Sequence, residues 1–265
     1  MMPFRTTSIL AGSLLLLAAF CAACLRSSGE GEGEGEGEGE GEGEGEGEGD
    51  GEGEGEGEGE PASGFGAISG PCGFLDEELT GPLPSFHEGT TIDFGTDPYD
   101  DGDFERLSPG AQEILQDGNA GGSSELSEAI GFDVLARCEG ATLIKTELEI
   151  DYTQASTKIT DFTVDIDGTV LGVNPVRTFV FPAGAALTLD EATRRLEGKL
   201  DDVLISSANV APADAWAKQI ILVIAAEPEH VPVVREAWDG LDDTTRHDSI
   251  VLVLLTEGDD AFLVE

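Results

Sequence analysis

Residues 141–177, ATLIKTELEIDYTQASTKITDFTVDIDGTVLGVNPVR, decide the expected fold because three successive strands can be read from them. In segment 144–152, apolar and other uncharged side chains alternate with charged ones, and in segment 160–166 mainly apolar side chains alternate with mainly polar ones. A period of two places the two kinds on opposite faces of a strand, which a helix cannot do. Asp167-Gly168 then precedes residues 170–177, and Asp-Gly suits the two positive φ angles of a type I′ hairpin. The stretch therefore predicts a three-stranded meander at the centre of a sheet.

Helices and buried strands are expected on both sides of the meander. A short helix should begin at Ser108-Pro109, and a second should follow Gly121-Gly122, with Glu125 and Glu128 in its first turn. After the meander, Thr188 and Glu191 form a capping-box pattern at the start of a long helix.

The apolar runs 218–226 and 249–256 are typical of strands covered on both faces, with a helix expected at 231–241 between them. A short last strand is expected at 261–264. Segment 82–105 shows little periodicity, and its acid-rich run 97–103 is expected to be a solvated loop rather than a calcium site. The order α, β, β, β, α, β, α, β predicts an α/β (α+β) protein with a mixed sheet.

The chain is strongly acidic, with 13 Lys and Arg against 55 Asp and Glu and a formal net charge of -42. Removing the 16 acids of residues 29–60 and the two arginines before them leaves 39 acids and 11 bases in residues 61–265, a net charge of -28. This charge makes nucleic acid and anionic lipid unfavourable partners. Residues 61–265 have the length of a single globular domain.

The first 23 residues have the parts of an export signal: a basic start with Arg5, an apolar run and small residues at the end. The segment FCAAC, which ends at Cys24, resembles the lipobox of bacterial lipoproteins, in which the Cys is lipidated and becomes the first mature residue. This resemblance implies an exported protein, periplasmic or at the cell surface, held to a membrane by a lipid on Cys24. The alternative is an ordinary secretory signal cut near Ala23.

Residues 29–60 are sixteen Gly-acid pairs that have nothing to bury, so we expect a disordered tether. A Gly-rich coil of this length averages about 30 Å from end to end. With Cys24 lipidated and the signal removed, only Cys72 and Cys138 remain, and exported proteins favour disulfides. We therefore expect these two residues to pair; two buried free thiols are the alternative.

Several sequence words resemble one uncharacterised family of eukaryotes and bacteria. The family carries GGSS…SE, LxKTExExxY, KxTD and GVSVTRA in this order, and residues 121–265 contain GGSS, LIKTELEIDY, KITD and the altered GVNPVRT. The order of elements is also similar to the restriction-endonuclease-like PD-(D/E)xK fold, in which a helix with an acid precedes a meander bearing metal-binding acids. Such a resemblance implies a fold, and the function has to be argued from the site.

A PD-(D/E)xK site uses acids to hold magnesium against a phosphodiester and a lysine to orient or activate water. Asp161 suits the first acid, but the expected acid-x-Lys is missing from residues 170–177. A rearranged site could bind Mg²⁺ or Mn²⁺ through Glu128, Glu147 and Asp161, with Lys145 and Arg177 as catalytic cations. The competing interpretation is that the strand residues form the solvated face of an ordinary sheet.

Other chemistries find less support in the sequence. His87, His230 and His247 are not at metal-ligand spacing and are expected at the surface or in loops. The sequence contains no G-x-S-x-G, S-x-x-K or P-loop motif. We expect a non-catalytic surface or binding domain without a cofactor, and a metal-dependent phosphodiesterase or nuclease is the alternative. Convergence of the three acids with Lys145 or Arg177 in one cleft would favour the enzyme.

Overall fold

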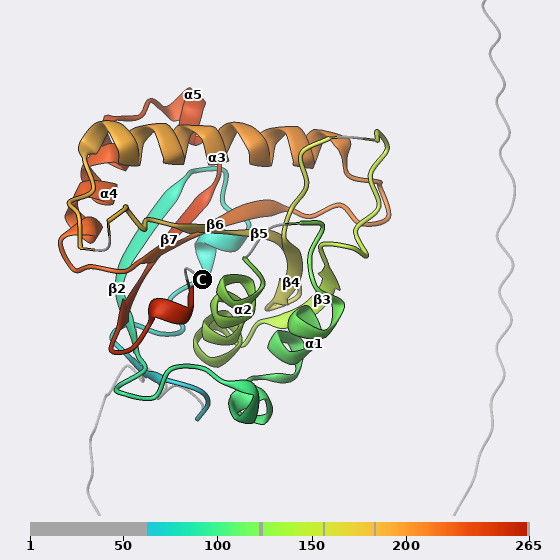
Figure 1. Ribbon diagram of the computed structural model, residues 1–265. Helices are drawn as coiled ribbons and strands as arrows, with labels where there is room; N and C mark the ends of the chain where they lie inside the picture. Colours follow the sequence, from blue (N-terminus) through green and yellow to red (C-terminus); the bar gives the residue numbers. More distant parts are fainter. Residues whose placement is uncertain (1–62, 122–123, 156, 183, 264–265) are drawn as a thin grey trace, which may run out of the picture. The chain divides into compact units, whose positions relative to one another are not determined.

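The computed structural model describes residues 63–121, 124–155, 157–182 and 184–263, and Figure 1 shows their arrangement. The expected signal peptide, Cys24 and the Gly-Glu tether lie outside the described residues. The strands are β1 (Ala67–Ser69), β2 (Ser85–Asp93), β3 (Thr142–Thr146), β4 (Phe162–Ile166), β5 (Thr169–Arg177), β6 (Lys218–Ala225) and β7 (Ile250–Glu257). The helices are α1 (Pro109–Asp117), α2 (Glu125–Glu139), α3 (Leu189–Asn209), α4 (His230–Gly240) and α5 (Asp243–Arg246), with 3-10 turns η1 (Glu77–Leu79), η2 (Asp101–Arg106) and η3 (Ala261–Leu263).

The strands form one mixed sheet in the order β1-β2-β7-β6-β5-β4-β3. Strands β2, β7, β6 and β5 run parallel, and the outer pairs β1–β2, β5–β4 and β4–β3 are antiparallel. From α2 onward the main elements follow the predicted order of helix, three strands, helix, strand, helix and strand. The predicted α/β class with a mixed sheet is confirmed. The predicted position of the meander is wrong, because β5, β4 and β3 lie at one edge of the sheet and β6 is its central strand.

The predicted hairpin is present between β4 and β5. Asp167 and Gly168 have φ angles of 50° and 80°, as a type I′ turn requires. The first strand was predicted at 144–152, but β3 ends at Thr146. Its pairing with β4 shifts between Leu143 and Lys145. This irregularity breaks the alternation, so Leu143 packs on the core and Ile144 is 47% exposed.

The sheet is covered on both faces by helices. Helices α1 and α2 pack on one face and α3 and α4 on the other, and each face has its own apolar core. Every residue of β6 is buried, as its continuous apolar run predicts. Gly131 lets α2 approach the sheet closely, since a Cβ at this position would lie 2.6 Å from Leu222 Cδ2.

The capping of the predicted helices is only partly as expected. Thr188 Oγ1 accepts a hydrogen bond from the Glu191 backbone N–H at 3.2 Å, which is the forward half of the predicted capping box. The Glu191 carboxylate instead binds Arg194 and Arg195 on the helix surface. At α1, Pro109 occupies the first turn as predicted, but the Ser108 side chain makes no cap hydrogen bond.

Two parts of the domain differ from the predicted order of elements. Strand β2 lies in segment 82–105, where no strand was predicted; Gly89 has a φ of 108° and the pairing with β7 shifts between His87 and Thr90. This irregularity interrupts the period of two that would have identified a strand. Residues Ala261–Leu263 form a 3-10 turn in place of a last strand.

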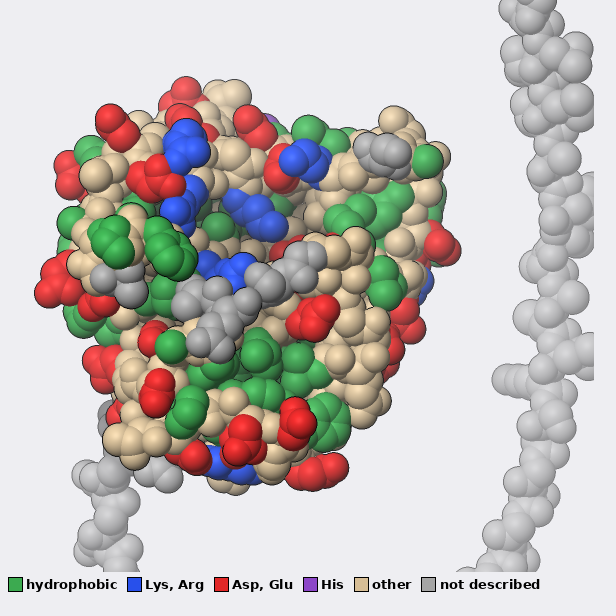
Figure 2. Space-filling model, viewed as in Figure 1, with side chains coloured by type: hydrophobic (Ala, Val, Ile, Leu, Met, Phe, Trp, Pro, Cys, Tyr) green, Lys and Arg blue, Asp and Glu red, His purple; other side chains and the backbone are tan. Residues whose placement is uncertain are grey.

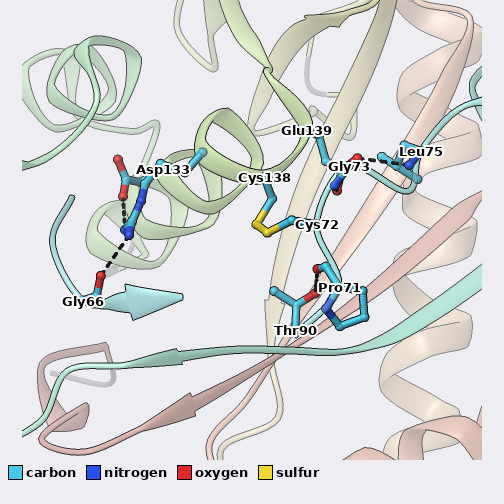
Figure 3. The surroundings of a disulfide bond; sticks show 10 residues. Gly66, Pro71, Cys72, Gly73, Leu75, Thr90, Asp133, Cys138 and Glu139 are labelled. Carbon is cyan, nitrogen blue, oxygen red and sulfur yellow. Dashed lines mark hydrogen bonds and ion pairs between the residues drawn. A yellow bond between two sulfur atoms is a disulfide. The ribbon is translucent and has the colours of Figure 1, made fainter. Parts of the chain in front are cut away.

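The disulfide Cys72–Cys138 is present and ties the N-terminal segment to the last turn of α2 (Figure 3). Next to it, the two carboxylate oxygens of Glu139 accept hydrogen bonds from the backbone N–H groups of Gly73 and Leu75, both at 3.0 Å. The predicted pairing is therefore confirmed, and it is reinforced by contacts between the same two segments.

Candidate functional site

The candidate site lies where β4 and β5 part. Phe162, the first residue of β4, pairs with Val173, whereas β5 continues along β6 to the pair Arg177–Ile224. The carboxyl end of β5 therefore extends past the start of β4, and Asp161 lies at this junction. In open α/β sheets, ligands bind outside the carboxyl ends of parallel strands, so this is a favourable location for a site.

Glu128 approaches this junction from the first turn of α2. Glu128 is only 4% exposed to solvent. Burial is the main reason that its pKa is raised to about 7, and the charges of Asp161 and Glu147 raise the pKa further. Hydrogen bonds with the Ser124 and Asn119 side chains oppose this effect. Glu128 is thus a buried acid whose pKa is influenced by the charges of two other carboxylates.

Asp161 is in the same electrostatic environment. Burial raises its pKa to about 6, the Lys199 ammonium opposes this rise, and the Glu147 carboxylate adds to it. Glu147 follows the end of β3, and its Oε2 accepts a hydrogen bond from the Ala120 backbone N–H at 2.5 Å. Glu128, Glu147 and Asp161, which we call the acidic triad, come from three different elements and lie close enough for their charges to interact.

The lysine of this site is Lys199, which the sequence analysis did not select. Its Nζ lies 3.4 Å from Asp161 Oδ2. Lys199 comes from α3, across the sheet from the helix that carries Glu128. It is seven residues after the buried Ala192 and four before the buried Val203, so it lies within the apolar stripe of α3. A lysine in such a stripe is the signal that could have identified it.

The two cations proposed from the sequence have different surroundings. Lys145 Nζ donates to Asp214 Oδ2 at 2.8 Å and to the Glu149 carbonyl at 3.0 Å, so the structure does not direct Lys145 to the acidic triad. Arg177 Nη1 donates to the Leu263 carbonyl at 2.6 Å. That carbonyl also accepts from Ser127 Oγ, which places Arg177 beside the α2 turn that holds Glu128.

The donor chemistry of the acidic triad fits a hard divalent cation, because magnesium and manganese prefer carboxylate oxygens. Magnesium usually binds one or two carboxylates together with water and substrate phosphate. Among the described residues, only Glu113, Asp117 and Glu149 place three ligand oxygens within 4.8 Å of one another. The residues of this other trio are exposed, and two of its carboxylates accept hydrogen bonds from Thr146. The acidic triad is therefore not a closed three-carboxylate cage.

Basic side chains gather around a hollow beneath α3 (Figure 2). A pocket between α3 and the ends of the strands includes Arg177 and Arg195 in its lining. Arg195 donates to the backbone carbonyls of Arg177 and Phe179, at 2.9 and 3.0 Å, and so holds the segment after β5 against α3. We call the pocket with Arg177 and Arg195, together with Arg194 and Lys199 of the same helix α3, the basic hollow.

Two of the three histidines differ from the sequence prediction. His230 is 3% exposed, and its Nδ1 lies 3.2 Å from Thr178 Oγ1. His87 lies on β2 and stacks on Phe74, and burial lowers its pKa. His247 is exposed, as expected. None of the three histidines belongs to the cluster of Glu113, Asp117 and Glu149, which among the described residues has the spacing of metal ligands.

Among the described residues, no helix has the length and apolar character needed to cross a membrane. The sequence matches no known family profile, and no solved structure matches it. Over 123 residues it is 45% identical to a protein of Dictyostelium discoideum described as "AAC-rich mRNA clone AAC4 protein". The match covers 44% of this chain and 18% of that protein, so the chain spans less than a fifth of the relative's length.

Proposed function

We propose that this domain is a divalent-metal-dependent phosphodiesterase with a rearranged PD-(D/E)xK-type site. The observation that carries the proposal is the contact of Lys199 with Asp161, whose pKa, like that of the buried Glu128, is raised mainly by burial. Burying carboxylates that repel one another costs stability, and such arrangements concentrate at functional sites. A bound divalent cation would offset this repulsion.

In this proposal, Glu128, Asp161 and Glu147 are the residues that hold Mg²⁺ or Mn²⁺. The metal, when bound, polarises a phosphoryl oxygen and lowers the pKa of a bound water. Lys199 takes the place of the lysine that is missing from β5: its ammonium favours the charged form of Asp161 and is available to orient a water. Arg177, beside the first turn of α2, contributes positive charge for the substrate phosphate.

The expected location is a second part of the proposal. A lipid on Cys24 would anchor the exported protein to a bacterial membrane, and the acidic tether 29–60 would hold the domain away from it. The sequence expectation of a non-catalytic surface or binding domain is the competing function, and the following experiment separates the two.

The purified full-length chain is incubated with bis(p-nitrophenyl) phosphate in Mg²⁺, in Mn²⁺ and in EDTA. We expect metal-dependent hydrolysis that falls by about 100-fold or more in Asp161→Asn and in Lys199→Met. Asp190→Asn is the matched control, because Asp190 is an exposed acid in the first turn of α3. Binding of Mn²⁺, followed by electron paramagnetic resonance, should weaken in Asp161→Asn. Absence of metal-dependent hydrolysis would refute the enzyme and leave the non-catalytic binding domain.

A further inference from the structure

Most cations of the folded body are paired with its own carboxylates. At least nine of the eleven Lys and Arg residues in 61–265 form such ion pairs: Arg106, Arg137, Lys145, Lys158, Arg194, Arg195, Lys199, Arg235 and Arg246. Lys218 is buried and donates to three backbone carbonyls. Duplex DNA is bound by neutralising several phosphates at once. The body, with its net charge of -28, does not provide a track of that kind.

Positive charge is instead concentrated at the basic hollow. Arg194 and Arg195 share one acid, Glu191, so two guanidinium groups face a single carboxylate. Lys199 adds a third cation next to Asp161, one of the expected metal ligands. These three cations pair with two carboxylates, Glu191 and Asp161, which leaves one formal positive charge to attract a phosphate.

An exposed aromatic ring accompanies the basic hollow. Phe181 is 91% exposed, the largest value among the exposed large hydrophobic residues of the described chain. It lies two residues beyond Phe179, whose carbonyl is bound by Arg195, so at most about 7 Å of chain separates these two Cα atoms. Stacking of a nucleic acid base on an aromatic side chain contributes about 1–3 kcal/mol. Phe181 therefore provides an exposed apolar ring on the segment that Arg195 holds against α3.

We propose that the substrate is a small phosphodiester that carries an aromatic group of nucleoside size, with its phosphate in the basic hollow and its ring on Phe181. This inference rests on the proposed function and adds the substrate class. Long duplex nucleic acid is not the preferred substrate in this proposal, because only a single local cluster of cations would contact its phosphates.

The test compares a fluorescently labelled thymidine dinucleotide with a 30-base-pair DNA duplex, using the full-length chain in Mg²⁺. Hydrolysis and equilibrium binding by fluorescence anisotropy are measured separately. We expect kcat/KM for the dinucleotide to exceed the value per phosphate of the duplex by about 10-fold or more. The logarithm of the binding constant for the dinucleotide should fall with the logarithm of salt concentration with a slope of only about -1 to -2.

Phe181→Ala should raise KM and Kd for the dinucleotide by about 10-fold, in line with the loss of one stacked base, with kcat unchanged. Its inhibition by dimethyl phosphate, which has no ring, should be unchanged. Leu83→Ala is the matched control, because Leu83 is 74% exposed and lies before β2.

Preference for the duplex with a steep salt dependence, or a Phe181→Ala variant with unaltered dinucleotide affinity, would overturn the inference. Dinucleotide binding that depends on Phe181 without hydrolysis would support the ligand class and refute the phosphodiesterase. The two proposals can therefore fail separately.

Discussion

Glu128→Gln should stabilise the folded domain at pH 8. The pKa of Glu128 is raised from 4.5 to about 7, mainly by burial. At about 1.4 kcal/mol for each pH unit, this difference corresponds to roughly 3 kcal/mol of unfavourable free energy once the carboxylate is charged. Gln keeps the size and the hydrogen-bonding ability of the side chain and removes the charge.

The sign of the pH dependence follows from the direction of this change. Because the pKa of Glu128 is higher in the folded state, the unfolded chain releases its proton first, and stability is lost as the pH rises from about 4.5 to about 7. The free energy of unfolding of Glu128→Gln should therefore exceed that of the parent by about 2–3 kcal/mol at pH 8 and by less than about 1 kcal/mol at pH 5. The raised pKa of Asp161 acts in the same direction and remains in both proteins.

Urea denaturation of both full-length proteins at pH 5 and pH 8 measures these differences. Glu125→Gln is the control, because Glu125 is an exposed acid in the same turn of α2. Saturating Mg²⁺ should recover part of the lost stability in the parent and less of it in the variant, since a bound cation compensates the charge. A variant that is no more stable than the parent at pH 8, or a difference that does not change with pH, would refute the reasoning.

Three further predictions concern the disulfide, the helix packing and the anchor. Cys72→Ser should lower the free energy of unfolding by about 2–4 kcal/mol in urea denaturation, because the disulfide closes a loop with a sequence separation of 66; an unchanged value would contradict this. Gly131→Ala should lower the free energy of unfolding by about 1–3 kcal/mol, because its methyl group would overlap Leu222. In Gly198→Ala on α3 the methyl group meets nothing within 4 Å, so the free energy of unfolding should rise by about 0.5–1 kcal/mol. The opposite order in thermal denaturation would disprove this packing argument. Cys24→Ala should abolish incorporation of radiolabelled palmitate in a bacterial host, and label that persists would rule out the lipid anchor.

The sequence was most informative where one short segment determines its own conformation. The Asp167-Gly168 turn, the buried strand β6 and the forward cap of α3 at Thr188 depend on residues that are neighbours in the chain. The pairing of Cys72 with Cys138 was predicted from the two cysteines that remain if the expected signal is removed and Cys24 is lipidated. Strand β2 was missed because it is irregular at Gly89 and pairs with β7, which is far away in the sequence.

The chain by itself thus determined the α/β class, the meander and three acids of a candidate site, because periodicity and turn chemistry are local properties. Only the tertiary structure decided which cation accompanies those acids. Lys145 is close to Glu147 in sequence but binds Asp214, whereas Lys199 reaches Asp161 from a helix on the opposite face of the sheet. The physical reason is that burial and the distance between charges on different elements depend on how helices pack across a sheet, and no period in the sequence encodes that distance.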